Sequence, residues 1–564
     1  MTSDPRAFVL DNARGEDAIR EVLGQAYSVA EEHAATGSGA RRRTWLDTFD
    51  WRLHGAGLVL EHEQTRRGGR LTLTGADGAL ITEQPVTGWQ SSRPAHLPAG
   101  PVTDRIGAQI SPRALLPVAR AVSTRGVFRL LNSDGKTVAR ILVDRTTTAG
   151  MELNLRLQVA EVRGYPAQAR RAAAILATIA SPAAESVFAD ATTANGRAPG
   201  SYSGKVDAAI TADMPAQTAV VTLLSSLLDT LEQNVDGVLR DIDTEFLHDL
   251  RVAVRRTRSA LKLLGDVLPA DLIAHYKTEF KWLGDLTTPV RDLDVYLLGF
   301  GDLASGLLAA TPEDLEPFRE FLVRRRAAEF RRLAAGLRSV RFRALTHDWR
   351  KALTELSESG KRRERRTKTA ARSAVQAADR PTARSVAQAA ARSAAGALAT
   401  ERTGRAVRQL TRRGAAITAQ SPAESLHDLR KRGKELRYLL EFFAPIYDRG
   451  AYRTVLADMK KLQDCLGEFQ DSQVQREEIT TLAQQMLADS ADRVGSASRA
   501  SGADRAALVA TLLAMGEINA RLSVNQQRAR AEFGSRFAQF AGPATQRHIQ
   551  ALLTRVVPAT QGDQ

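Results

Sequence analysis

Hydrophobic and polar positions alternate differently in the two parts of the chain. Within the first 200 residues, short stretches alternate with a period of two, which is typical of strands. Turn sequences such as Ala-Asp-Gly at 76–78 and Ser-Asp-Gly at 133–135 separate these stretches. Beyond about residue 205, apolar positions recur every three or four residues almost without interruption, which predicts helices. The chain is therefore expected to fold as an antiparallel α+β region followed by an all-α region.

The patterns also predict individual elements and boundaries. In the first region we expect strands near 57–63, 70–74, 126–131, 138–143 and 152–159, and helices near 15–33, 112–122 and 166–180. In the second region we expect helices at 216–240, 244–266, 270–287, 290–308, 312–338 and 342–357, then at 383–415, 422–444, 450–466, 468–490, 502–534 and 543–555. The predicted domains are 1–190, a Gly/Pro-rich linker at 191–210, and a helical domain at 211–555 made of one repeat at 211–358, a connector at 359–382 and a second repeat at 383–555.

An internal duplication organises the helical region. The sequence Leu-His-Asp-Leu-Arg at 247–251 returns 179 residues later at 426–430. The same shift, without a gap, carries Lys281 onto Lys460 and Asp292 onto Asp471. A register held over more than forty residues indicates two copies of one structural unit.

Each copy predicts a helix with an apolar stripe and a cationic stripe, because its residues recur at spacings of three and four. The cationic stripes are His248, Arg251, Arg255, Arg258 and Lys262 in the first copy, and His427, Arg430 or Lys431, Lys434 and Arg437 in the second. Such a stripe is either a solvated face or a binding face. Like charges at these spacings repel one another, and the cost occurs twice at matched positions, so an anion-binding face is favoured.

Further cations are candidates for the same site. Lys277 and Lys281 lie on the helix that follows the first stripe, and Lys460 is the counterpart of Lys281 in the second copy. For each, a solvated position is an equally good interpretation. Asp292 and Asp471 are expected to orient neighbouring cations by ion pairing or to cap a helix.

Composition narrows the class of partner. The formal net charge is +15 and the pI is near 10.2, which favours polyanions: nucleic acid, an acidic membrane surface or polyphosphate. Aromatic residues are only 5% and do not gather among the cationic stripes, so platforms for base stacking are not evident. Cys465 is the only cysteine, which excludes an intrachain disulfide and a cysteine-based zinc site. With neither a signal-peptide pattern nor a run of about 18 apolar residues, we expect a cytoplasmic protein without a membrane partner.

The segment Thr-Trp-Leu-Asp-Thr at 44–48, with Arg52-Leu53 and Gly55-Ala56-Gly57-Leu58, resembles the CYTH domains, the triphosphate tunnel metalloenzymes. That resemblance implies a tunnel in which Arg and Lys hold a triphosphate and paired Glu bind a divalent metal. The first strand, 6–12, lacks the family's Glu-x-Glu-x-Lys pattern, and Arg156, Gln158 and Ala160 stand where glutamates are expected.

We therefore expect a degenerate tunnel domain with little or no triphosphatase activity, no cofactor, and a divalent metal only if the tunnel is active. Its remaining cations, Arg66, Arg70, Arg129 and Arg140, either line the tunnel or face solvent.

The two duplicated helices resemble the CHAD domain, the conserved histidine α-helical domain. The resemblance rests on the two His-Asp-Leu-Arg motifs, on Arg255 and Arg258 in the first copy, and on Lys434, Arg437 and Tyr438 in the second. It implies two pseudo-symmetric four-helix bundles that bind inorganic polyphosphate through a basic groove, and it adds Tyr438 to the candidate site.

The duplicated histidines are either an acid–base pair or donors to phosphate oxygens, and binding is favoured because no nucleophile or metal cluster accompanies them. We assign no catalytic residue and no metal ligand. The alternatives are a metal-dependent inorganic triphosphatase or polyphosphatase, and a non-specific nucleic-acid binder. Association with polyphosphate granules is a further expectation.

Overall fold

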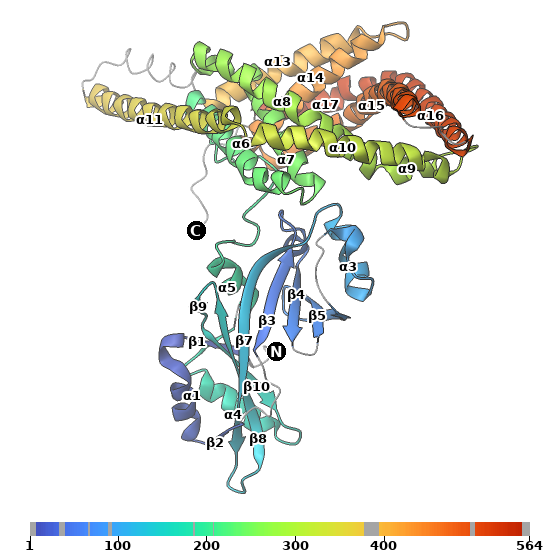
Figure 1. The fold of residues 1–564 in the computed structure, drawn as a ribbon. Helices are drawn as coiled ribbons and strands as arrows, with labels where there is room; N and C mark the ends of the chain where they lie inside the picture. The colour runs from blue at the N-terminus through green and yellow to red at the C-terminus, as the bar shows by residue number, and fades with distance from the viewer. Residues whose placement is uncertain are drawn as a thin grey trace. The chain divides into compact units, whose positions relative to one another are not determined.

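The chain divides into two compact units, Met1–Gly204 and Lys205–Gln564. The computed structural model describes residues 7–32, 40–65, 68–87, 93–183, 186–206, 208–376, 394–496 and 502–554. Figure 1 shows the first unit built around a sheet and the second built from helices. The predicted change from strands to helices is confirmed.

An antiparallel sheet forms the first unit, which confirms its α+β class. The strand order is β11-β1-β10-β8-β7-β3-β4-β5-β6, with β2 paired to β7 and β9 to β8. The strands are β1 (Ala7–Leu10), β2 (Ser28–Glu31), β3 (Arg41–Asp47), β4 (Leu58–Thr65), β5 (Gly68–Gly75), β6 (Leu80–Val86), β7 (Leu116–Leu131), β8 (Thr137–Thr148), β9 (Met151–Glu152), β10 (Leu155–Glu161) and β11 (Ser181–Pro182). The long strand β7 pairs with β8, β3 and β2, so it connects the two ends of the sheet.

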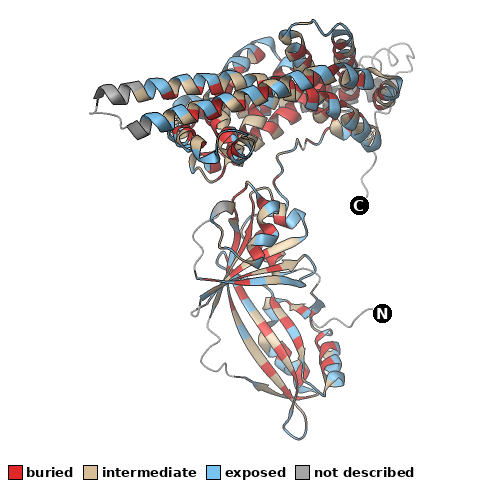
Figure 2. Ribbon diagram, turned by 90° about the vertical axis from the view of Figure 1, so that its right-hand side faces the viewer, coloured by how far each residue is buried: buried red, intermediate tan, exposed pale blue. Residues whose placement is uncertain are grey.

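Helices cover the sheet with their apolar sides. The helices are α1 (Gly15–Gly24), α2 (Arg52–Gly55), α3 (Pro101–Ile110), α4 (Pro166–Leu176) and α5 (Val187–Ala194). Ile19 of α1 and Leu176 of α4 join one core with β1, β8 and β10. Ile106 of α3 joins a second core with β4 and β5. Figure 2 shows the alternation of buried and exposed positions along the strands that these cores require.

Two predicted helices of this unit need correction. The helix expected at 112–122 is wrong, because residues 116–131 form strand β7, where pairing on both sides outweighs a local helical preference. The helix expected at 15–33 ends at Gly24, and β2 follows. The linker expected at 191–210 begins inside α5, and Tyr202 is buried against Phe49 with ring centroids 4.4 Å apart, so apolar contacts hold this segment.

The helical unit repeats one packing order. The helices of its first half are α6 (Ala216–Leu239), α7 (Thr244–Leu263), α8 (Ala270–Leu298), α9 (Phe300–Ser305), α10 (Glu316–Leu337) and α11 (Val340–Gln376). Those of the second half are α13 (Ala395–Ala415), α14 (Ala423–Phe442), α15 (Arg449–Ser496), α16 (Gly502–Ala541) and α17 (Pro543–Thr554). The order α11-α6-α7-α8-α10 in the first half matches α17-α13-α14-α15-α16 in the second. The duplication in the sequence is thus a duplication of packing, and α7 packs against α14 where the halves meet.

Several helices are longer than expected. The break predicted between 287 and 290 is wrong, since α8 continues through Pro289. The hydroxyls of Thr287 and Thr288 donate to the carbonyl of Gly284, which adds hydrogen bonds in the turn that proline weakens. The break predicted at Gly467 is also wrong, because α15 is continuous there and an interior glycine costs only about 1 kcal/mol relative to alanine.

The connector between the halves is partly helical. Helix α11 runs on to Gln376, so most of the connector predicted at 359–382 continues a helix, and its end lies outside the described residues. The first part of the helix predicted at 383–415 also lies outside them, and α13 begins at Ala395.

A second contact between the halves is apolar. Leu293 of α8 and Phe318 of α10 share one core with Ile479 of α15 and Met515 of α16. Cys465 is buried, as predicted for a small core residue. By length and composition alone, the segment Arg505–Ala541 of α16 would suffice to cross a membrane. Only 28% of its most apolar stretch is buried within the structure, where α16 packs along α15.

Candidate functional site

The cationic stripes lie on the outer side of α7 and α14, because the opposite sides of both helices are buried. Leu250 and Leu261 of α7 are fully buried, as are their counterparts Leu429 and Leu440 of α14. The carboxylate of Asp243 caps α7 by accepting from the backbone N–H of Glu245 at 2.9 Å, which fixes where this helix begins. The predicted two-sided pattern of both helices is therefore present.

Ion pairs across the α7–α14 junction show how the halves are related. Arg256 donates to Glu441 at 3.0 Å, and Lys262 donates to Glu435 at 2.7 Å. The repeat shift of 179 residues relates position 256 to 435 and 262 to 441. It therefore exchanges the two pairs, and an approximate two-fold axis runs between α7 and α14.

Arg255 and Lys434, which the repeat shift also relates, lie close together beside this axis. Lys434 is half-buried, and burial followed by the positive charges of Arg430, Arg255 and Arg437 lowers the pKa of its ammonium to about 8, against the attraction of Asp471. Because Arg255 comes from α7 and the lysine from α14, cations of both halves share one electrostatic environment.

We call this cluster the basic face. It consists of Arg251, Arg255 and Arg258 from α7, and Arg430, Lys434 and Arg437 from α14. Arg255 and Arg258 are exposed, and neither forms an ion pair with any residue that the structure describes. The cluster therefore retains uncompensated positive charge.

Neighbouring helices position the more buried arginines. Arg251 donates to the hydroxyl of Thr288 at 2.7 Å, and burial lowers the pKa of its guanidinium. Arg430 donates to Asp471 at 2.7 Å, which confirms the expected orienting role of that carboxylate. At the equivalent position, burial raises the pKa of Asp292, and Arg251 and Arg291 oppose this shift. Both duplicated aspartates thus lie beside the duplicated arginine.

The structure separates the remaining candidates into several groups. His427 bonds through Nδ1 to Gln470, and His248 is half-buried. Lys262 belongs to the junction, where it pairs with Glu435 of α14, and Arg437 of the basic face pairs with Glu441 on its own helix. Tyr438 is buried and stacks on Phe442 with ring centroids 6.0 Å apart, and burial raises the pKa of its hydroxyl.

The other lysines are exposed. Lys431 pairs with Asp428 and Lys281 with Asp285 along their own helices. Lys277 and Lys460 are exposed on α8 and α15. No contact places these four lysines with the basic face among the described residues, so they remain predictions.

Comparison with known proteins assigns this region to a family. Residues 222–480 match the family described as the CHAD domain. These residues are a CHAD domain. The CHAD domain from the plant Ricinus communis is similar over 59% of this chain and 95% of its own, with 22% identity and a TM-score of 0.43. PptA from Streptomyces chartreusis is similar over 57% of this chain and 99% of its own, with 16% identity and a TM-score of 0.38. The search of curated proteins finds no match.

One cation of the CHAD domain was missed as a site residue. Arg291 is half-buried on α8, donates to the carbonyl of Thr244 at 3.4 Å and lies 3.7 Å from Glu245. It adds positive charge beside Arg251. Its counterpart in the second half is Gln470, so a search for cations repeated in both copies passes over it.

In the first unit, a set of arginines is paired with carboxylates. Arg43 donates twice to Glu61, at 2.6 and 2.7 Å, and it lies 4.7 Å above the Trp45 ring. Arg125 donates twice to Asp144, at 2.7 and 2.6 Å. Arg41 lies between Glu63 and Asp144, at 3.3 and 3.2 Å. These cations are neutralised within the unit.

The cations predicted for the tunnel have varied surroundings. Arg70 pairs with Glu83 at 3.3 Å, Arg140 lies 3.6 Å from Glu32, and Arg129 is half-buried. Arg66 lies outside the described residues. No group of three His, Cys, Asp or Glu side chains within the described ranges is placed to hold a metal ion.

The motif that resembles the CYTH family has a structural role here. Asp47 is buried, and its carboxylate accepts from the backbone N–H groups of Thr48, Leu53 and His54 at 2.7 to 2.9 Å. It thus fixes the turn between β3 and α2. A putative adenylate cyclase from Bacillus halodurans is similar over 31% of this chain and 89% of its own, with 17% identity and a TM-score of 0.22.

Proposed function

We propose that the CHAD domain binds inorganic polyphosphate on the basic face. The observation that carries this proposal is the juxtaposition of Arg255 and Lys434, which come from the two halves; burial, Arg430 and Arg255 lower the pKa of the lysine ammonium. A polyanion laid across α7 and α14 would relieve that repulsion. The resemblance of the duplicated motifs to the polyphosphate-binding CHAD family supports the same ligand.

The chemistry of polyphosphate suits these side chains. Each internal phosphate carries about one negative charge and no base edge, so guanidinium groups can follow the chain by charge-assisted hydrogen bonds. A polyphosphate chain also has no direction, and a site with a two-fold axis likewise presents the same groups in both directions. A nucleic-acid strand has a direction, and base stacking requires aromatic platforms. These points favour polyphosphate over nucleic acid.

In this proposal the CHAD domain brings the protein to polyphosphate in the cytoplasm, including polyphosphate granules. Binding is favoured over hydrolysis, because Arg43, Arg125 and Arg41 of the first unit already pair with carboxylates. The enzymatic alternative predicts divalent-metal-dependent release of phosphate from tripolyphosphate. A release assay with and without Mg²⁺ on the full chain tests that alternative directly.

The decisive test measures polyphosphate affinity at two salt concentrations. The variant Arg255→Gln/Lys434→Gln should bind at least about tenfold more weakly and show a smaller salt dependence, because fewer counterions are released. The matched control is Arg331→Gln/Arg343→Gln, which removes two charges from exposed positions of α10 and α11. Equal losses in both variants would indicate a general charge effect and contradict the basic face.

Competition separates the two classes of polyanion. Polyphosphate and RNA are compared at equal concentrations of phosphate charge with the wild-type chain. Preferential displacement by polyphosphate is expected, whereas equal displacement would favour a non-specific nucleic-acid binder.

A further inference from the structure

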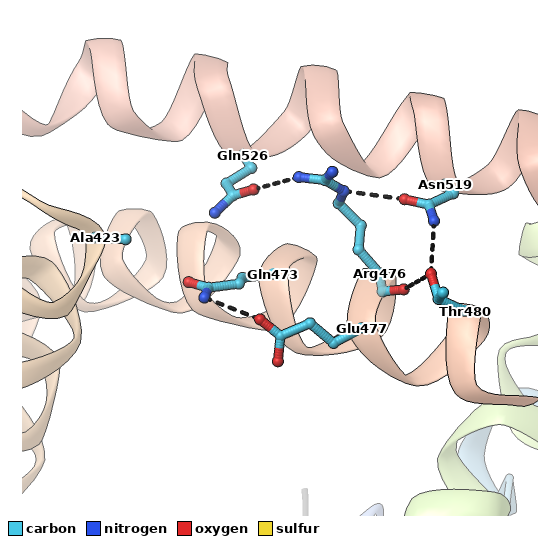
Figure 3. Close-up of a pocket in the computed structure, with 7 residues that line it drawn as sticks. All are labelled: Ala423, Gln473, Arg476, Glu477, Thr480, Asn519 and Gln526. Atoms are coloured by element: carbon cyan, nitrogen blue, oxygen red, sulfur yellow. Dashed lines mark hydrogen bonds between the residues drawn. The ribbon is translucent and has the colours of Figure 1, made fainter.

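A polar hollow of about 260 Å³ lies between α15 and α16, beside the first residue of α14 (Figure 3). The residues that line it are Ala423, Gln473, Arg476, Glu477, Thr480, Asn519 and Gln526. Apart from Ala423 every one of these side chains is polar, so the hollow offers hydrogen bonds to a polar ligand.

Arg476 gives the hollow a positive group with neutral partners. Its Nε donates to the amide oxygen of Asn519 at 3.0 Å, and its Nη1 donates to the amide oxygen of Gln526 at 2.9 Å. Amide oxygens fix the orientation of a guanidinium without cancelling its charge. Figure 3 shows the amide nitrogen of Gln526 on the side of the hollow, so a second donor accompanies the arginine.

Glu477 is the acidic residue of the lining. Its carboxylate accepts from Gln473 Nε2 at 3.1 Å, and the residue is exposed. In Figure 3 it lies on the opposite side of the hollow from the guanidinium of Arg476. Its charge opposes an anion in the hollow, and this makes it a sensitive site for a test.

The hollow continues the line of the basic face. Ala423 lies one helical turn before His427 on α14, and Gln473 lies one turn beyond Gln470 on α15. His427 and Gln470 are hydrogen-bonded to each other, so the two helices are joined next to the hollow. Following α14 from the two-fold axis, one passes Lys434, Arg430 and His427 and then reaches the hollow.

The first half does not reproduce this lining. The repeat shift relates Gln473 to Asp294 and Arg476 to Leu297. Asp294 is buried, and Arg326 of α10 donates to it. The two ends of the basic face therefore differ, although Arg255 and Lys434 at its centre are related by the two-fold axis.

We propose that this hollow is a subsite for the terminal phosphoryl group of a polyphosphate chain. The inference rests on the proposed function of the basic face. A terminal phosphoryl group carries one more free oxygen than an internal one, and close to two negative charges at neutral pH. Arg476 and the amide of Gln526 can meet that group, while the rest of the chain runs along α14.

Short and long chains distinguish this subsite from the basic face. In tripolyphosphate, two of the three phosphates are terminal, whereas a chain of several hundred phosphates binds mainly through internal ones. Arg476→Gln should therefore weaken tripolyphosphate about tenfold or more. It should change the affinity for long chains, measured per binding site by calorimetry on the full protein, by less than about twofold.

Two more variants keep the test valid if loss of Arg476 unfolds the hairpin of α15 and α16. Gln473→Glu leaves both hydrogen bonds of Arg476 in place and adds negative charge, so it should weaken tripolyphosphate as well. Glu477→Gln removes negative charge at an exposed position and should strengthen tripolyphosphate a few-fold.

The outcomes separate the two proposals. Unchanged tripolyphosphate affinity in folded variants, or equal losses for short and long chains, would overturn the terminal subsite and leave the basic face standing. If the wild-type protein binds neither chain length, both proposals fail.

Discussion

At the scale of single residues, Lys434 shows how the packing of two duplicated helices changes the environment of a charge. In one copy alone, a lysine at this position would be an ordinary half-buried cation. Pairing with the other copy brings Arg255 alongside it, in addition to Arg430 and Arg437 of its own helix. The pKa of about 8 follows from burial and from these like charges, so the free protein holds this proton weakly.

Polyphosphate binding should depend on pH through this residue. A bound polyanion favours the ammonium form and raises the pKa of Lys434, so binding takes up a proton near pH 8 and weakens as the pH rises above 8. Calorimetry at pH 8 in two buffers of different ionisation enthalpy measures the uptake. In Lys434→Arg, which stays charged, the uptake and the loss of affinity between pH 7 and 9 should disappear. An unchanged pH profile in that variant would assign the dependence to another group.

Residue-level prediction succeeded where a feature was repeated and failed where partners were distant. The stripes, the duplicated arginines and the role of Asp471 follow from periodicity and repetition. Lys262 looked like a free cation, because Glu435 becomes its partner only when α7 and α14 pack, whereas the partner of Arg437, Glu441, lies four residues further along the same helix and was overlooked. Tyr438 is buried for the same reason, since the packing of α14 determines which side of it is covered.

At the scale of elements, ion pairs and close packing hold the helices in register. Both side chains of the Arg256–Glu441 pair are about 15% exposed, whereas Lys262 in the related pair is 64% exposed. Removing one partner of a partly buried pair leaves the other charge desolvated, so it costs more than removing one partner of an exposed pair.

Glu441→Gln should therefore lower the free energy of unfolding of the helical unit by about 2 kcal/mol. Lys262→Gln, in the exposed pair, should cost less than about 1 kcal/mol. Urea unfolding of Glu441→Gln, Arg256→Gln and the double variant Arg256→Gln/Glu441→Gln gives the coupling energy of the partly buried pair. Equal costs for Glu441→Gln and Lys262→Gln would show that burial does not decide the contribution.

Glycines in helices offer a second comparison. A Cβ on Gly237 of α6 would lie 2.1 Å from the ring of Phe246 on α7, whereas a Cβ on Gly433 of α14 would meet nothing within 4 Å. Gly237→Ala should destabilise the helical unit by about 1–3 kcal/mol, because the ring must move. Gly433→Ala should stabilise it by up to about 1 kcal/mol, because alanine favours helix. Thermal unfolding of both variants checks the opposite signs.

A helix or strand was predicted correctly where residues close together in the sequence determine it, and incorrectly where distant residues do. The order of helices was predictable because apolar periodicity is long and regular. The continuity of α8 through Pro289 and of α15 through Gly467 was not predictable, since packing along the whole length of each helix outweighs the local cost of these residues. Strand β7 was predicted as a helix at its beginning because those residues pair with β3, which lies far earlier in the sequence.

At the scale of the whole molecule, the two compact units have separate cores and separate charges. In the first unit Arg41, Arg43 and Arg125 pair with carboxylates, whereas in the second unit Arg255 and Arg258 of the basic face form no ion pair with any described residue. A substitution or a ligand that acts on one unit should therefore change the stability of that unit alone.

Calorimetric unfolding of the full chain should show two transitions. Polyphosphate at 100 times its Kd should stabilise only the helical unit, by about 2.7 kcal/mol. Glu61→Gln, which leaves Arg43 unpaired, should lower only the transition of the sheet unit. A shift of both transitions by polyphosphate would point to a second binding region in the sheet unit.

The charges at the α7–α14 junction also determine which surfaces can associate. At these positions the first half carries only cations, Arg256 and Lys262, and the second half only carboxylates, Glu435 and Glu441. If α7 of one molecule docked on α7 of another in the same geometry, Arg256 would face a lysine, and α14 on α14 would bring carboxylates together. Such like-charge contacts oppose self-association. Two identical copies produced by a gene duplication would bind each other and themselves equally well. Here the two halves have diverged in charge, so each half binds the other half in preference to a second copy of itself. This favours pairing of the halves within one chain over pairing between two chains.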